Sequence, residues 1–175
     1  ICMRNGIFCD TLCGVLCSLG FEGVIRQAIH QLKYRSLRAL AVPLTELLRD
    51  YLVNNPMVGE VLVPVPLHQK RLRERGYNQS SLLAQELGKL INLPVVDDCL
   101  IRKRHAPPQA RTSTADERWR NVAEAFSCRD HRLQDRRVLL IDDVSTSGAT
   151  LDACAAALKV AGAASVWGLA LAREI

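Results

Sequence analysis

The stretch LLIDDVSTSGAT, residues 139–150, decides the fold of this chain. An apolar run ends in two adjacent acids, Asp142 and Asp143, and a short segment of hydroxyl residues and glycine follows. The pattern predicts a buried strand over 138–142 and a helix from about Thr150 to Gly162, since glycine is common just after a helix. A strand that leads through a tight turn into a helix is a building unit of α/β domains.

The predicted turn between strand and helix suits a phosphate. A helix start offers unpaired N–H groups and the positive end of a dipole, and Gly148 lets the backbone approach a ligand closely. The two carboxylates upstream can accept hydrogen bonds from vicinal ribose hydroxyls and lie near a bound magnesium ion. An alternative is a surface turn whose acids only cap the helix. The candidate phosphate-binding residues are Val144, Ser145, Thr146, Ser147, Gly148, Ala149 and Thr150.

Composition fits one globular domain. Of 175 residues, 49% are hydrophobic and 23% charged, so the chain can bury a sizeable core. The formal net charge of +5 suits anionic ligands, either phosphates or nucleic acid. No apolar run approaches the ~20 residues that span a bilayer, so we expect no membrane insertion. The seven cysteines form no even, closely spaced framework, which favours a reducing, cytoplasmic location.

Strand and helix patterns alternate along the chain. Apolar residues at three- and four-residue spacing predict two helices within 21–53, with a turn at 33–36. Further predicted elements are a buried strand at 61–65, a helix capped by Asn78 and ending near Ile91, and short strands at 95–96, 122–128 and 165–172. This order predicts a parallel sheet, whose ligands bind at the carboxyl ends of its strands.

A basic loop is expected over 68–76, directly after the strand at 61–65. Its cations Lys70, Arg71, Arg73 and Arg75 fall within six residues. Arginine can clamp a pyrophosphate through paired hydrogen bonds, and lysine can hold it as a point charge. The alternatives are a solvated basic turn and a patch for nucleic-acid phosphates.

Four cysteines, Cys2, Cys9, Cys13 and Cys17, lie near the beginning of the sequence. No two of them have the Cys-x-x-Cys spacing, which disfavours a zinc site built from two tight pairs. At four-residue steps, Cys9, Cys13 and Cys17 would instead line one face of a helix as small buried residues. Zinc bound by all four cysteines stays an alternative.

Two segments together resemble the ComF family, the competence-associated, phosphoribosyltransferase-like proteins of bacteria. They are VPVPLHQKRLRERGYNQSSLLAQEL, residues 63–87, and LLIDDVSTSGATL, residues 139–151. The second also resembles the phosphoribosyl pyrophosphate (PRPP) motif of type I phosphoribosyltransferases, with Ser147 where that motif usually has threonine. Residues 32–34 and 102–126 are similar to the family as well. The run RGYNQ, residues 75–79, is its most specific part.

The resemblance implies a type I phosphoribosyltransferase-like parallel sheet flanked by helices, spanning 57–175. Residues 1–56 would form a helical, cysteine-containing appendage. Asp142 and Asp143 would be the catalytic acids that hold the ribose hydroxyls of PRPP and lie near Mg2+, and 144–150 would cradle its 5′-phosphate. The implied pyrophosphate-binding residues are Lys70, Arg71 and Arg75, and those of a flap over the substrate are Arg102, Arg104, Gln109 and Arg111.

The implied reaction is phosphoribosyl transfer to an acceptor that the residues do not identify, with magnesium neutralising the departing pyrophosphate. Two alternatives belong to other classes. The chain could bind PRPP or a nucleotide without turnover, as an accessory protein of DNA uptake, or it could be a nucleic-acid-binding module. The expected partners are therefore PRPP or a related ribose phosphate, and single-stranded DNA or the competence machinery. An oligomer is compatible with the sequence.

Overall fold

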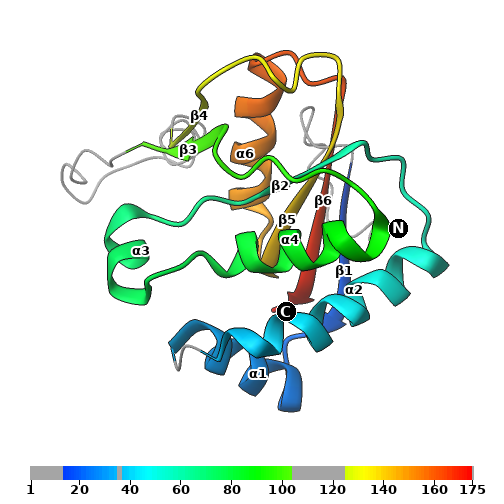
Figure 1. The fold of residues 1–175 in the computed structure, drawn as a ribbon, viewed down its shortest axis with the longest axis vertical. Helices are drawn as coiled ribbons and strands as arrows, with labels where there is room; N and C mark the ends of the chain where they lie inside the picture. The colour runs from blue at the N-terminus through cyan, green and yellow to red at the C-terminus, as the bar shows by residue number, and fades with distance from the viewer. Residues whose placement is uncertain (1–13, 35–36, 104–124, 175) are drawn as a thin grey trace.

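A four-stranded parallel sheet forms the centre of the computed structural model, which describes residues 14–34, 37–103 and 125–174. Its strands, in spatial order, are β1 (Gly14–Gly20), β6 (Ser165–Arg173), β5 (Arg137–Ser145) and β2 (Val61–Pro64). All three pairings are parallel. The predicted α/β class with a parallel sheet flanked by helices is therefore confirmed (Figure 1).

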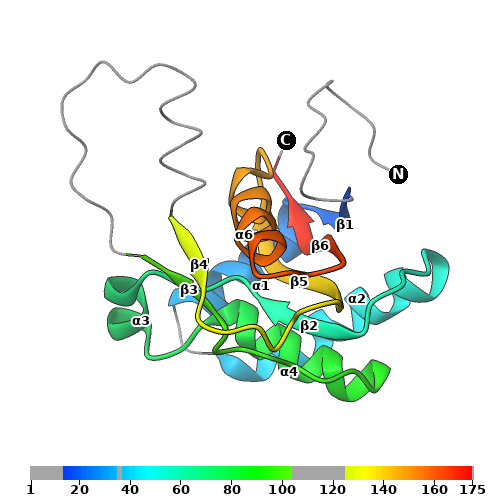
Figure 2. The same ribbon diagram turned by 90° about the horizontal axis from the view of Figure 1, so that it is seen from above.

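Helices cover both faces of the sheet, because the side chains of β5 alternate between two cores. Val138 and Leu140 belong to the core beneath α6 (Ala149–Val160), whereas Leu139 and Ile141 belong to the opposite core. That second core holds α1 (Gly23–Tyr34), α2 (Ala41–Asn54) and α4 (Gln79–Ile91). Figure 2 shows α6 on one side of the sheet and α2 and α4 on the other.

The segment 68–76, expected as a loop, contains a short helix, α3 (Gln69–Arg75). His68 caps it, because Nδ1 accepts a hydrogen bond from the Lys70 N–H at 3.2 Å. Gly76 ends it in the left-handed conformation, at φ 79°. The loop prediction was therefore wrong.

Most other expected elements are present. Asn78 caps α4 as predicted, and α2 ends at Asn54, ahead of Pro56. The expected strand at 95–96 is a single bridge between Val95 and Leu62. The strand expected over 122–128 is β4 (Phe126–Cys128), which pairs antiparallel with the unpredicted β3 (Leu100–Arg102). A 3-10 turn, η1 (Arg38–Leu40), precedes α2.

The N-terminal part joins the main sheet. Cys17 lies on β1 and pairs with Ala170 of β6, so the helical face predicted for Cys9, Cys13 and Cys17 is wrong at Cys17. Cys9 and Cys13 lie outside the described residues. A short apolar run fits a buried strand as well as a helix, which explains the error. The division at residue 56 stays a prediction, although α1 and α2 pack on the same core as α4. None of the described helices is both long and apolar enough to cross a membrane.

Candidate functional site

The carboxyl end of β5 and the first turn of α6 enclose one pocket. β5 continues past the acid pair to Ser145, and Gly148, at φ 82°, turns the chain into α6 at Ala149. Ser147 alone among the candidate phosphate-binding residues does not line this pocket. The lining residues are Asp142, Val144, Ser145, Thr146, Gly148, Ala149, Thr150 and Leu151. The structure thus brings one acid together with the start of the helix.

The start of α6 is open to a ligand. Gly148 occupies the N-cap position and supplies no side-chain acceptor for the first-turn N–H groups. Within the described residues, a long contact of 3.4 Å runs from the Ala149 N–H to Ser147 Oγ. Thr146 and Thr150 are exposed, so their hydroxyl groups face solvent or a ligand. This combination suits a phosphate group.

The two adjacent acids have different surroundings. Asp142 is 8% exposed and lines the pocket, whereas Asp143 is 4% exposed and is paired with α1. Successive residues of a strand point to opposite faces, which accounts for the difference. The two carboxylates therefore cannot play the same role toward one ligand in this arrangement.

Asp142 is held by two donors. Its Oδ1 accepts hydrogen bonds from Ser80 Oγ at 3.0 Å and from the Asp143 N–H at 2.9 Å. Burial and the neighbouring negative charge of Asp143 raise the pKa of Asp142 well above its usual range. Asp142 is thus a carboxyl group that retains a proton more readily than an ordinary aspartate.

Asp143 is paired with Lys33, a residue that the sequence analysis did not place in the site. Lys33 Nζ, at the end of α1, lies 2.6 Å from Asp143 Oδ2. The other oxygen, Oδ1, accepts a hydrogen bond from the Val144 N–H at 2.9 Å. Ser80 was missed as well. The only signals for them were family-like segments, residues 32–34 for Lys33 and 63–87 for Ser80.

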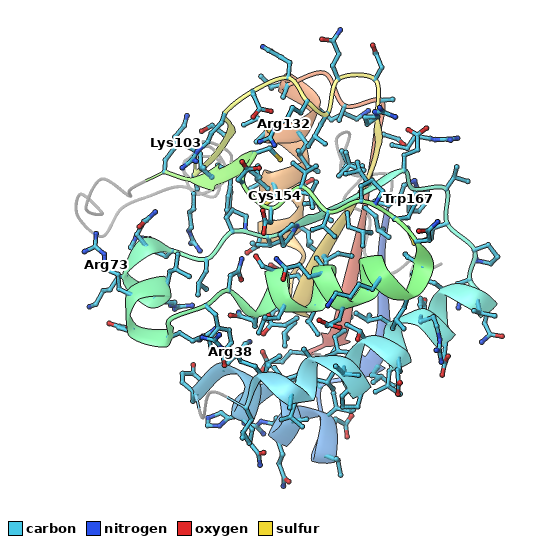
Figure 3. The ribbon with its side chains drawn as sticks, viewed as in Figure 1. Arg38, Arg73, Lys103, Arg132, Cys154 and Trp167 are labelled. Carbon is cyan, nitrogen blue, oxygen red and sulfur yellow. The ribbon has the colours of Figure 1, made fainter. Side chains whose placement is uncertain are left out.

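The candidate pyrophosphate residues divide into two groups. Lys70 and Arg71 are exposed on α3, which extends to one side of the sheet (Figure 1). Figure 3 shows Arg73 of the same helix pointing outward. Arg75 is half-buried and is engaged within the protein, because its guanidinium group bonds Gln79 Oε1 and lies 5.3 Å from the centroid of the Tyr34 ring.

Of the candidate flap residues, only Arg102 lies in the described part of the chain. Its guanidinium carbon is 5.4 Å from the centroid of the Phe126 ring. Its positive charge opposes the rise that burial causes in the pKa of Cys154 on α6. The Arg102 Nε atom is buried and has no hydrogen-bond partner within the described residues. Arg104, Gln109 and Arg111 lie outside the described residues.

A metal site made by protein side chains alone is absent from the described part of the chain. No group of three or more His, Cys, Asp or Glu residues is placed there to hold a metal ion. Asp143, with Lys33 on one oxygen and an amide on the other, does not fit a direct metal ligand. A magnesium ion would therefore depend on oxygens of a bound ligand.

The parallel sheet and the pocket at the carboxyl end of β5 define a phosphoribosyltransferase-like α/β domain. Among solved structures, glutamine PRPP amidotransferase from Bacillus subtilis, complexed with ADP and GMP, has a TM-score of 0.51 and 17% sequence identity. The likeness covers 75% of this chain and 26% of that one. At this identity it concerns the fold alone.

Curated relatives identify the family. Competence protein F of Haemophilus influenzae is 38% identical over 117 residues, which cover 65% of this chain and 51% of that protein. DNA utilization protein YhgH of Escherichia coli is 33% identical over 152 residues, 84% of this chain and 66% of that protein. The chain belongs to the ComF family of competence-associated, phosphoribosyltransferase-like proteins. It spans about half of the first relative's length, and no protein-family profile matches it.

Proposed function

We propose that the pocket between β5 and α6 binds the ribose 5-phosphate part of PRPP or of a related ribose phosphate. The observation that carries the proposal is that Asp142 and the uncapped start of α6 line the same pocket. The phosphate would accept hydrogen bonds from the first-turn N–H groups and from the Thr146 hydroxyl. Asp142 would then contact a ribose hydroxyl.

The proposed reaction is phosphoribosyl transfer. The bond between ribose C1 and the pyrophosphate oxygen breaks, and its electron pair leaves with pyrophosphate. A lone pair of the acceptor then forms the new bond to C1. Asp142 is the proposed catalytic residue, because in its ionised form, which is populated above its raised pKa, the carboxylate near the ribose favours the positive charge that develops on the ring. Lys70 and Arg71 are the proposed cations for pyrophosphate, because both are exposed.

Magnesium enters this proposal as a partner of the ligand. Bound to pyrophosphate oxygens, Mg2+ would neutralise charge on the leaving group. In this proposal the acid pair does not ligate the ion directly, because the Lys33 ammonium group already pairs with the Asp143 carboxylate.

Calorimetry with PRPP and Mg2+ tests the binding. We expect saturable binding by the wild type, and binding weakened about tenfold or more in Asp142→Asn, which loses the ionisable carboxyl group and its second acceptor oxygen but keeps its shape. Asp50→Asn removes a carboxylate of an exposed ion pair and should bind like the wild type. No PRPP binding by the wild type would refute the proposal. A screen for pyrophosphate release over nucleobases and amines then separates a transferase from a protein that only binds PRPP.

A second candidate function is supported by α3. Lys70, Arg71 and Arg73 are exposed, and no ion pair within the described residues neutralises them. The names of the relatives, competence protein F and DNA utilization protein, point to DNA uptake. We propose here an accessory protein of competence that binds PRPP without turnover and contacts single-stranded DNA through α3.

Oligonucleotide binding tests this candidate. We expect an affinity that falls steeply with salt, because contacts to phosphates release counterions. Replacing Lys70, Arg71 and Arg73 by Gln should weaken binding and flatten the salt dependence, whereas Asp142→Asn should leave both unchanged. Equal binding by the triple variant and the wild type would exclude α3 as the contact.

A cytoplasmic location also remains a proposal. It is supported by three free cysteines of the described part, Cys99, Cys128 and Cys154, which suit a reducing compartment.

A further inference from the structure

We propose that Lys33 is a built-in counter-ion that takes the place of a divalent cation at Asp143. In the free protein its ammonium group keeps metal ions away from this carboxylate, so a metal ion reaches the site only as part of a complex with a phosphorylated ligand. This inference concerns the same site and therefore deepens the proposed function. Only its second part, the arrival of the metal ion together with a phosphorylated ligand, rests on that function.

The contacts of Asp143 support the exclusion of metal. Each carboxylate oxygen has one partner: Oδ2 forms an ion pair with Lys33 Nζ at 2.6 Å, in a geometry that is not a hydrogen bond, and Oδ1 accepts the Val144 N–H at 2.9 Å. The Asp143 side chain is 5% exposed and that of Lys33 is 21% exposed, so the pair is largely shielded from water. A divalent ion on Oδ2 would sit about 2.0–2.6 Å from that oxygen, within repulsive distance of the ammonium group.

The residues on either side of Lys33 both contact the junction of α3 and α4, at residues 75–78. The Tyr77 hydroxyl donates to the Leu32 carbonyl, and the Arg75 guanidinium lies 5.3 Å from the centroid of the Tyr34 ring. Arg75 is the last residue of α3, and Tyr77 lies in the turn 76–78 that joins α3 to α4. The end of α1 is therefore anchored by a buried hydrogen bond one residue before the lysine and contacts the same junction one residue after it.

The same turn also orients the other acid. Asn78 caps α4, and Ser80, in the first turn of that helix, bonds Asp142. Arg38 lies 4.6 Å from the centroid of the Tyr77 ring, and Figure 3 shows it in the region between α1 and α4. The junction of α3 and α4 thus contacts both neighbours of Lys33, the partner of Asp143, and leads directly into Ser80, the partner of Asp142. This is the arrangement expected if the lysine belongs to the site.

Binding of Mn2+ alone to the full chain tests the inference, with the electron paramagnetic resonance signal of free Mn2+ as the readout. We expect weak or no binding by the wild type. Lys33→Met removes the ammonium group and should bind one Mn2+ about tenfold or more tightly. Adding Asp143→Asn to Lys33→Met should abolish that gain. Lys33→Arg keeps the charge and should resemble the wild type.

Lys89→Met is the matched control, because it removes a lysine from an exposed ion pair with Glu86. It should bind Mn2+ like the wild type. The inference is overturned if folded Lys33→Met and the wild type bind Mn2+ equally, or if Lys89→Met gains the same affinity.

A second measurement needs no variant. The amide NMR signal of Val144, whose N–H is bonded to Asp143, should stay sharp when Mn2+ alone is added and broaden when Mn2+ and PRPP are added together. Broadening by Mn2+ alone would overturn the inference. If PRPP does not bind at all, the proposed function fails, while the Mn2+ affinities of the wild type and Lys33→Met still decide the role of the lysine.

Discussion

Ser80 and Asp142 are 62 positions apart in the chain, and the hydroxyl group of the first donates a 3.0 Å hydrogen bond to the carboxylate of the second. The bond ties the first turn of α4 to the carboxyl end of β5. Both side chains are buried, so water does not replace either partner. The orientation of the acid that lines the pocket thus depends on a residue from another layer of the fold.

Ser80→Ala should therefore affect both stability and ligand binding. We expect a loss of about 1 kcal/mol in the free energy of unfolding, because Asp142 Oδ1 keeps only the Asp143 N–H as a donor. PRPP binding should weaken because the carboxylate is no longer held in one orientation. Urea denaturation and calorimetry measure the two effects. Ser80→Thr, which keeps the hydroxyl group, should restore binding; a variant that lacks the hydroxyl group and binds fully would contradict the assignment.

Asp142 should make stability depend on pH. Its pKa is raised in the folded protein by burial and by the charge of Asp143, so the folded state holds a proton that the unfolded state has lost. The contribution of this group is complete below the unfolded pKa, near 3.8, and is lost as pH rises through the raised folded value. Unfolding free energies measured from acid to alkaline pH should fall more steeply in the wild type than in Asp142→Asn. If the free energy of unfolding depends on pH equally in the two proteins, the pKa of Asp142 is not raised in the folded state.

Gly148 should resist substitution for a conformational reason. A Cβ built there meets nothing within 4 Å, but φ is 82°. Gly148→Ala should thus cost about 1–2 kcal/mol of stability through backbone strain alone. Gly148→Asn should cost less, since asparagine tolerates the left-handed region. Thermal denaturation of the two variants checks the order, and an alanine variant as stable as the wild type would show that the turn can relax.

Cysteine reactivity should follow burial. Burial raises the pKa of Cys99 to about 12, and its side chain is fully buried, so little thiolate is available to react. Cys128 is partly exposed and should be alkylated before Cys99 and Cys154 in the native protein. Mass spectrometry of peptides after timed iodoacetamide treatment gives the order. All three should react in denaturant, and early labelling of Cys99 under native conditions would contradict its placement.

Tyr77→Phe should loosen the end of α1. The change removes the donor to the Leu32 carbonyl and keeps the ring beneath Arg38. We expect a loss of about 1 kcal/mol in stability and faster amide hydrogen exchange over 29–34, with little change over 165–173. Unchanged exchange in α1 would show that the hydroxyl contact does not anchor this helix.

Local patterns were sufficient to predict the main elements. The apolar run before Asp142 identified β5, the asparagine at 78 identified the cap of α4, and Gly162 marked the end of α6. Each of these signals lies within a few residues of the element that it predicts. They also placed residues 144–150 ahead of a helix start, although β5 continues to Ser145 and does not end at the acid pair as expected.

The failures have physical causes. α3 was missed because its seven residues, QKRLRER, carry a single apolar side chain and so show no helical period. β3 was missed because three residues are too few for a pattern. Lys33 and Ser80 contact the acids across more than sixty positions, and no local rule predicts such pairs. Their place in the site could be read only from the folded chain.

The order of strands has a consequence for synthesis on the ribosome. Among the described strands, β1, at residues 14–20, pairs only with β6, at residues 165–173. The earlier strand therefore emerges long before this neighbour exists, and its pairing with β6 cannot form until more than a hundred further residues are made. Completion of this edge is a late event in folding, and a nascent chain stalled before β6 leaves a bare strand for chaperones to protect.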